Sequence, residues 1–281
     1  MTETWLRCFS LSPEQRLDVL NLMNRTETHV GREAIDETRR RTVVHGWPAE
    51  HWLQYDHAML VHYAMVTGGD QAEVEMCGGG VDEDLLTQLL VLHEKLDWWT
   101  RGSQGPTHEK GRVIRTLHLM CVTLPVTSVP VPDGATLRIF ETGRDEIAWL
   151  EQNNAAFADH PEQGAWRNED LAYRTSEPWF DPSGFLLLEI DGRLAASCWT
   201  KVHELHPDRF GEIYIISVHP DFRNRNLGKV MVTQGLEVLR RKGVADAVLF
   251  VDESNTAAKA LYISLGFTVL RDDRLVRFGR N

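Results

Sequence analysis

The most constraining feature of the sequence is a strand that leads at once into a basic loop and then a helix. The apolar run at 212–218 (EIYIISV) predicts a buried strand, and residues 227–242 carry apolar side chains at helical spacing before Gly243. A second strand is expected at 247–251 and a second helix at 255–265. This order of elements predicts an α/β layer with parallel strands at its centre.

The loop between the first strand and its helix is basic in an acidic chain. Arg223, Arg225 and Lys229 lie within seven residues, whereas the chain has 30 Lys and Arg against 41 Asp and Glu and a net charge of −11. A helix start offers free backbone N–H groups and the positive end of the helix dipole, which together suit a phosphate or pyrophosphate. We therefore expect an anion site here, with a solvated basic turn as the alternative.

The length of 281 residues predicts about two domains at roughly 150 residues each. The segment 124–134 (LPVTSVPVPDG) holds three prolines and an Asp-Gly pair, which neither a helix nor a central strand accepts. We expect a first domain at 1–124, a linker at 125–135 and a second domain at 136–281.

Other patterns exclude several classes of protein. The four cysteines form no CxxC pair and the histidines form no HExxH motif, so no metal site is expected. No signal-peptide order opens the chain, and no run of 18 apolar residues occurs, which favours a cytoplasmic protein without a membrane partner. The acidic balance argues against nucleic acid, and we expect a monomer.

Further elements are expected in both halves. Ser12 and Pro13 mark a helix start, and Asp191-Gly192 marks a hairpin turn. The additional segments are a strand pair at 55–66, helices at 82–92 and 144–157, and hairpin strands at 185–190 and 194–202. The triple glycine at 78–80 is followed by ten residues without Lys or Arg, which favours a plain turn over a phosphate cradle.

Residues 212–267 resemble the acetyl-CoA core of the GNAT superfamily of N-acetyltransferases. The downstream pattern of that superfamily is complete, in Asn255, Ala258, Leu261, Tyr262, Gly266 and Phe267. The loop pattern keeps Arg223 and Gly228, but Asn226 replaces its first glycine. Asn is the ordinary residue that best tolerates positive φ, so we expect the site to survive this change.

Four segments outside these motifs resemble the mycothiol synthase family, which acetylates the cysteinyl amine of cysteinyl-glucosaminyl-inositol. They are 160–166 (HPEQGAW), 177–182 (EPWFDP), 199–203 (WTKVH) and 211–214 (GEIY). The resemblance covers nearly all of 136–278 and implies two tandem GNAT-like domains, each a mixed central sheet flanked by helices. The first domain is degenerate, because its loop at 77–82 lacks arginines, and acetyl-CoA binding there is left open.

Acyl transfer to an amine needs a neutral amine, a polarised thioester carbonyl and a proton for the departing thiolate. An α-amino group titrates near pH 8, so a modest base suffices, and Glu212 is the candidate, with a solvent-facing carboxylate as the alternative. The resemblance implies Tyr262 as the acid, with an aromatic packing residue as the alternative. Backbone N–H groups near Ser217 and Val218 could stabilise the oxyanion if the strand splays there. An acyl-enzyme on Cys198 is not needed for direct transfer.

The resemblance also implies ligand contacts in three groups. The expected acetyl-CoA contacts are Ile216, Ser217, Val218, Arg223, Asn224, Arg225, Asn226, Leu227, Gly228, Lys229, Asn255, Thr256, Ala257, Ala258, Lys259 and Ala260. The expected acceptor contacts are Glu33, Asp170, Lys201, Glu212 and the position of Phe250. Phe250 stands where the family usually has Tyr, so a hydroxyl contact to the acceptor would be missing.

These observations leave three functions open. The first is acetyl transfer from acetyl-CoA to cysteinyl-glucosaminyl-inositol, and the second is acetylation of another small-molecule amine. The third is an acetyl-CoA-binding module without turnover, against which Glu212 and Tyr262 argue.

Overall fold

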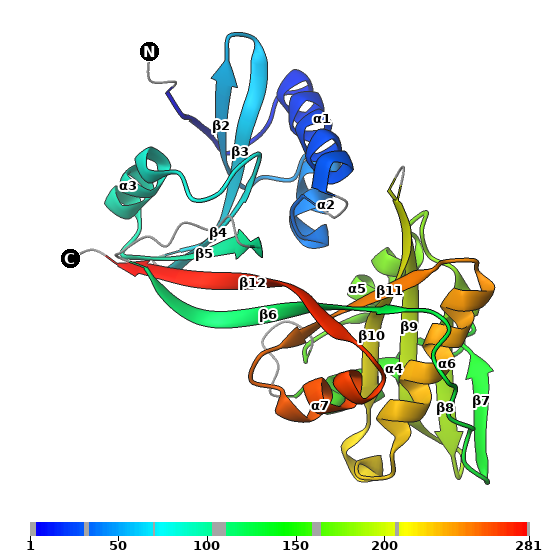
Figure 1. The fold of residues 1–281 in the computed structure, drawn as a ribbon. Helices are drawn as coiled ribbons and strands as arrows, with labels where there is room; N and C mark the ends of the chain where they lie inside the picture. Colours follow the sequence, from blue (N-terminus) through cyan, green and yellow to red (C-terminus); the bar gives the residue numbers. More distant parts are fainter. Residues whose placement is uncertain are drawn as a thin grey trace.

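A computed structural model describes residues 4–30, 34–69, 71–102, 111–158, 164–205 and 208–279. The chain forms one mixed twelve-stranded sheet with helices on both faces (Figure 1). The expected α/β class is therefore confirmed. No helix of the described ranges is both long and apolar enough to cross a membrane.

The first half begins with a capped helix, as Ser12 and Pro13 predict. Ser12 Oγ accepts a hydrogen bond from the backbone N–H of Gln15, and Gln15 Oε1 accepts one from the N–H of Ser12, so the two residues form a capping box. The elements of this half are β1 (Leu6–Cys8), α1 (Pro13–Val30), α2 (Glu37–His45), β2 (Glu50–Asp56), β3 (Met59–Gly68), β4 (Gln71–Cys77), α3 (Glu83–Leu92), β5 (Lys95–Arg101) and β6 (Arg112–Thr123).

The second half follows a segment, 125–134, that has neither helix nor strand, and it has the same order of elements except that a helix, α7, precedes its last strand. Its elements are β7 (Ala135–Ile139), α4 (Glu146–Ala156), α5 (Asn168–Thr175), β8 (Phe185–Ile190), β9 (Arg193–Leu205), β10 (Asp208–Val218), α6 (Leu227–Arg241), β11 (Asp246–Asp252), α7 (Thr256–Ser264) and β12 (Thr268–Gly279). The hairpin turn falls at Asp191 and Gly192, both with positive φ, as expected.

The two halves do not form separate sheets. The strand order is β1-β2-β3-β4-β5-β12-β6-β11-β10-β9-β8-β7, so each half contributes its last strand to the sheet of the other. Counted inward from its own edge of the sheet, each of β1 to β6 occupies the same place as the corresponding strand of β7 to β12. Each half contains one parallel pair, β4–β5 in the first half and β10–β11 in the second. Figure 1 shows β6 and β12 running side by side between the halves.

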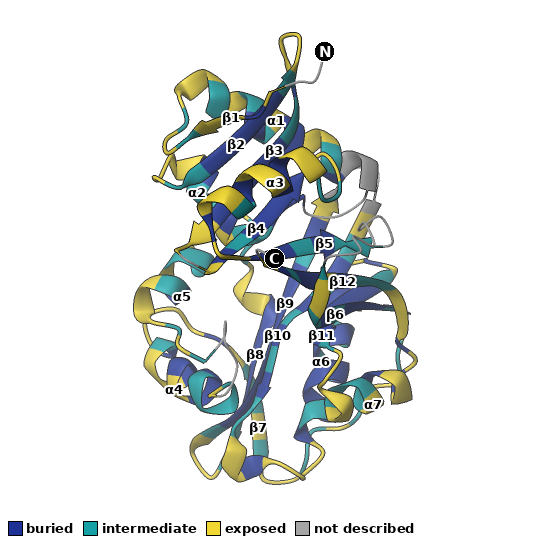
Figure 2. Cartoon of the chain, turned by 90° about the vertical axis from the view of Figure 1, so that its left-hand side faces the viewer, coloured by how far each residue is buried: buried dark blue, intermediate teal, exposed yellow. Residues whose placement is uncertain are grey.

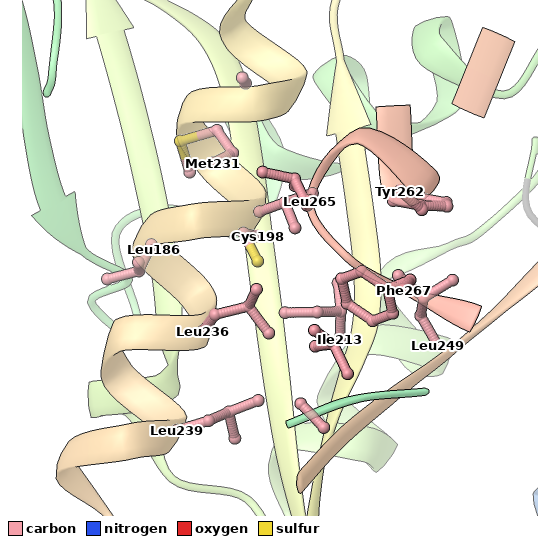
Figure 3. Close-up of a cluster of buried hydrophobic side chains, with 14 of the residues drawn as sticks. Leu186, Cys198, Ile213, Met231, Leu236, Leu239, Leu249, Tyr262, Leu265 and Phe267 are labelled. Carbon is pink, nitrogen blue, oxygen red and sulfur yellow. The ribbon is translucent and has the colours of Figure 1, made fainter. Parts of the chain in front are cut away.

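Each half buries one apolar cluster on each face of the sheet. In the second half α6 and α7 cover one face, packing Leu236, Tyr262 and Phe267 against strand residues such as Cys198 (Figure 3). Helices α4 and α5 cover the other face, where Trp149 packs near the ring of Trp199. Figure 2 shows buried residues following the strands, with exposed residues on the outer sides of the helices.

Candidate active site

Strands β10 and β11 separate soon after they meet. They pair in parallel at only two positions, Gly211 with Ala247 and Glu212 with Val248. Beyond these pairs β10 continues along β9, and β11 continues along β6. The backbone groups of β10 up to Ser217 and Val218 are therefore left out of the parallel ladder, as expected for N–H groups that serve a ligand. The separation begins earlier than expected, directly after Glu212.

The loop from β10 to α6 has the backbone that the sequence predicts for it. Asn226 has a φ of 60° and Asn224 a φ of 62°, so both lie in the left-handed region. Arg223 Nη2 donates a hydrogen bond to the carbonyl oxygen of Ala156 at 3.1 Å, which ties the loop to the end of α4. Arg225 is exposed beside the first turn of α6. Cations and helix N–H groups at one point suit a pyrophosphate.

Helix α7 brings small residues and one phenol to the same region. Asn255 Oδ1 accepts a hydrogen bond from the N–H of Ala258 at 3.1 Å and so caps the helix. Thr256, Ala257 and Ala260 are exposed, and Lys259 Nζ donates to the carbonyl oxygen of Glu253 at 3.0 Å.

Tyr262 lies one turn further along α7, and its side chain is 6% exposed beside the ring of Phe267 (Figure 3). Burial raises the pKa of the Tyr262 phenol well above its ordinary value, so the hydroxyl keeps its proton at neutral pH.

Glu212 forms a close pair with a histidine that sequence reasoning did not single out. His203 Nε2 lies 2.6 Å from Glu212 Oε2, within hydrogen-bond distance. The His203 ring stacks on the ring of Phe210 at a centroid distance of 4.6 Å, which fixes its plane. His203 lies in the segment WTKVH that carried the family resemblance, but no spacing rule shows that it reaches the next strand. The register of β9 and β10 brings the two side chains to one face.

The first half of the chain reaches this face of the second half through Glu37, the first residue of α2. Tyr214 Oη donates to Glu37 Oε2 at 2.6 Å, and Trp179 Nε1 donates to Glu37 Oε1 at 3.1 Å. Lys201 Nζ lies 4.0 Å from Glu37 Oε1 and 4.6 Å from the centroid of the Trp179 ring. Lys201 is 7% exposed, so charged groups of both signs converge in a largely dry environment.

The remaining predicted acceptor residues are dispersed. Glu33 lies outside the described residues. Asp170 accepts a hydrogen bond from the N–H of Arg167 at 2.9 Å and so caps α5. Phe250 follows Val248 on the same side of β11 and is 43% exposed, with the guanidinium of Arg271 6.0 Å from its ring centroid. The structure therefore joins Glu212 and Lys201 directly through cross-strand pairing, and adds Glu37 from the first half.

The corresponding region of the first half differs at each of these points. Strands β4 and β5 stay paired over five positions, so they do not separate early. The glycine loop forms a tight turn, because a Cβ at Gly78 would lie 2.3 Å from the carbonyl oxygen of Val61. Asp82 then caps α3, accepting from the N–H of Leu85 at 2.7 Å. A carboxylate at this helix start repels a phosphate, so the helix start at α3 does not suit a pyrophosphate as that of α6 does.

Comparisons with known proteins agree with this geometry. The model of the acetyltransferase (GNAT) family matches residues 148–267. A mycothiol acetyltransferase of Streptomyces griseus is 35% identical over 95% of this chain and 93% of that protein. One of Thermomonospora curvata is 56% identical over 60% of this chain and 59% of that protein.

Solved structures show the same fold over nearly the whole chain. A GCN5-related N-acetyltransferase from Sphaerobacter thermophilus has a TM-score of 0.66 at 21% identity, over 98% of this chain and 95% of that one. A tandem GNAT protein from the clavulanic acid biosynthesis pathway has a TM-score of 0.64 at 16% identity, over 98% of each chain. On these similarities the chain belongs to the mycothiol acetyltransferase family of GNAT acetyltransferases.

Proposed function

We propose that this protein transfers the acetyl group of acetyl-CoA to the cysteinyl amine of cysteinyl-glucosaminyl-inositol, which completes mycothiol. The observation that carries the proposal is the coincidence of two features in a member of this family. Strand β10 leaves the parallel ladder beside the basic start of α6. Its Glu212 lies on the face of the sheet that Glu37 of the first half contacts, which we call the acceptor side.

The proposed donor site lies where β10 leaves β11. Bound acetyl-CoA supplies the acetyl thioester. The N–H groups at the start of α6, with Arg223, Arg225 and Lys229, would hold its pyrophosphate, and the small residues at the start of α7 would lie along its pantetheine arm. The N–H groups of β10 near Ser217 and Val218 would donate to the thioester carbonyl oxygen. Among the described residues no cluster of metal ligands occurs, and this chemistry needs none.

The proposed proton transfers use two side chains. Glu212 accepts a proton from the cysteinyl ammonium, whose ordinary pKa near 8 leaves much of it charged at pH 7. His203 fixes the direction of the carboxylate through the 2.6 Å contact. Tyr262 gives its phenolic proton to the departing thiolate of CoA. Because burial raises the pKa of this phenol, the transfer is uphill and depends on the position of the hydroxyl next to the leaving sulfur.

The acceptor side has the chemistry of a polyol that carries one ammonium. Lys201 and Glu37 offer hydrogen bonds of opposite polarity to hydroxyl groups, and the Trp179 indole lies beside them with the Lys201 ammonium over its ring. We expect the protein to act as a monomer. A gel-filtration mass of twice 32.1 kDa would contradict it.

The test is turnover of purified protein with acetyl-CoA and cysteinyl-glucosaminyl-inositol, followed as release of the CoA thiol and as product mass. Acetyl-CoA binding without turnover would refute the proposed acceptor. In the same assay Arg225→Ala combined with Arg223→Ala should weaken acetyl-CoA binding by about tenfold or more, because charge-assisted hydrogen bonds to phosphate are lost. Unchanged affinity would show that the pyrophosphate lies elsewhere.

One residue favours a second candidate function, the acetylation of another small-molecule amine. Phe250 presents an exposed phenyl ring on the acceptor side, where a hydroxyl group is usual in the family. A less polar amine that is acetylated with a higher kcat/KM than cysteinyl-glucosaminyl-inositol would establish this alternative. The Phe250→Tyr variant separates the two, since it should lower KM only for the polyol.

A further inference from the structure

A buried arginine lies beneath the first turn of α2. Arg39 is 7% exposed, and its guanidinium contacts three carboxylates. The distances are 2.5 Å to Asp36, 2.5 Å to Glu73 and 3.3 Å to Glu75. Glu75 is 1% exposed and also pairs with Arg101. Buried charges of this kind are costly unless each is paired, so the cluster acts as one unit.

The cluster fixes the backbone from which Glu37 projects. Glu75 Oε2 accepts a hydrogen bond from the N–H of Asp36 at 2.9 Å. Asp36 Oδ1 accepts from the N–H groups of Thr38 and Arg39, at 2.8 and 3.1 Å. The two neighbours of Glu37 are therefore both held by hydrogen bonds. The N–H of Asp36 is bonded to Glu75 of β4, and the N–H of Thr38 is bonded to the capping side chain of Asp36. The backbone of Glu37 is thereby held where its carboxylate reaches Tyr214 and Trp179.

Glu73 occupies the place in β4 that Glu212 has in β10. In the first half Ala72 pairs with Leu96, the second residue of β5, and Glu73 comes next in the chain. In the second half Gly211 pairs with Ala247, the second residue of β11, and Glu212 comes next. In the second half this carboxylate meets His203, whereas in the first half it meets Arg39. In the first half, the carboxylate at the position of Glu212 therefore anchors α2 through Arg39.

We propose that Arg39, with Glu73 and Glu75, is a positioning cluster that holds Glu37 at the acceptor site of the second half. The proposal rests on the proposed function, because Glu37 is taken to contact the acceptor. Arg39 itself touches neither substrate, so its loss should act on acceptor binding through Glu37. Acetyl-CoA binding should not change, because the carboxylates that Arg39 contacts, Asp36, Glu73 and Glu75, are not among the expected cofactor contacts.

The experiment compares steady-state constants for both substrates in a set of full-length variants. The set is Arg39→Met, Glu73→Gln, Glu37→Gln, the double variant Arg39→Met with Glu37→Gln, and Arg277→Met. Arg277 is the matched control, because it forms an arginine–carboxylate pair with Asp97 at 2.6 Å between β12 and β5, away from α2. Glu73→Gln covers the case in which Arg39→Met does not fold, since the Glu73 side chain is 38% exposed and easier to neutralise.

The expected result is a rise of about tenfold or more in the acceptor KM for Arg39→Met, the factor for one lost hydrogen bond to a charged group, with an unchanged KM for acetyl-CoA. Glu73→Gln should show the same split at a smaller factor, and Arg277→Met should show none. In the Glu37→Gln background the Arg39 substitution should add less than twofold, because both changes remove the same contact.

Two results would overturn the inference while leaving the proposed function intact. The first is wild-type turnover with an acceptor KM that neither Arg39→Met nor Glu73→Gln alters. The second is a full additional rise from Arg39→Met in the Glu37→Gln background. Failure of the wild-type protein to acetylate cysteinyl-glucosaminyl-inositol would instead refute the proposed function, and Glu37→Gln would then have no acceptor KM to change.

Discussion

Replacement of Glu212 by Gln is the sharpest test of the proposed base. The carboxylate is 13% exposed and 2.6 Å from His203 Nε2, and a Gln Oε1 can accept the same hydrogen bond. The change therefore removes charge and basicity while it keeps volume and orientation. A positioned general base contributes about 10² to 10⁴-fold, so we expect kcat to fall by this factor, which corresponds to about 3 to 5 kcal/mol.

The assay measures kcat by release of the CoA thiol, with acetyl-CoA affinity and the midpoint of thermal unfolding as controls. Both controls should stay close to the wild type, because no buried partner is orphaned. Glu189→Gln is a matched variant on β8, where the carboxylate pairs with Arg138 at 2.6 Å and no substrate is expected. A kcat for Glu212→Gln within about fivefold of wild type would refute the assignment of Glu212 as the base.

Three further predictions concern the core around the donor site. Because burial raises the pKa of Tyr262, kcat should not decline as pH rises through about 10, where an ordinary phenol loses its proton. Tyr262→Phe should lower kcat more than it lowers acetyl-CoA affinity. A decline of kcat near pH 10 that this variant abolishes would contradict the raised pKa. Burial raises the pKa of Cys198 to about 12, so Cys198→Ala should retain turnover, and its inactivation would revive an acyl-enzyme. Gly235→Ala should destabilise the fold by about 1 to 3 kcal/mol in urea titrations, since a Cβ there would lie 2.5 Å from Cys198 Sγ, and adding Cys198→Ala should recover part of that loss.

Local structure was predictable because its causes are local. Ser12 with Pro13, Asp82 and Asn255 all start helices where capping chemistry places them, and the Asp191-Gly192 turn joins its strands. Positive φ at Asn226 followed from the one property that Asn shares with the glycine it replaces. The backbone conformation of the proposed anion site could thus be predicted at Asn226.

The pairing of strands that are distant in the sequence could not be predicted, because the spacing of apolar residues indicates only local structure. Residues 112–123 read as the end of a first domain, yet they pair with β11 and β12, more than 100 residues later. Glu37 was not singled out from the sequence, and only tertiary structure brings it to Tyr214, 177 positions away. The linker at 125–135 remains our proposed boundary between the repeats, although the sheet runs across it.

The exchange of β6 and β12 predicts that the second half depends on the first half for its fold. A chain of residues 136–281 would retain the proposed donor site but lose β6, which pairs with β11 over seven positions and with β12 along most of its length. Both strands would then present open edges and bury less apolar surface, so we expect this chain to aggregate on expression.

A chain of residues 111–281 keeps β6 and leaves only one side of β12 open, so its soluble fraction should be clearly larger. It should bind acetyl-CoA with wild-type affinity, since the anion loop is complete, but it lacks Glu37 and should bind the acceptor poorly. Equal solubility of the two chains would show that β6 contributes little to the second half. Wild-type acceptor KM in the longer chain would show that the first half takes no part in the acceptor site.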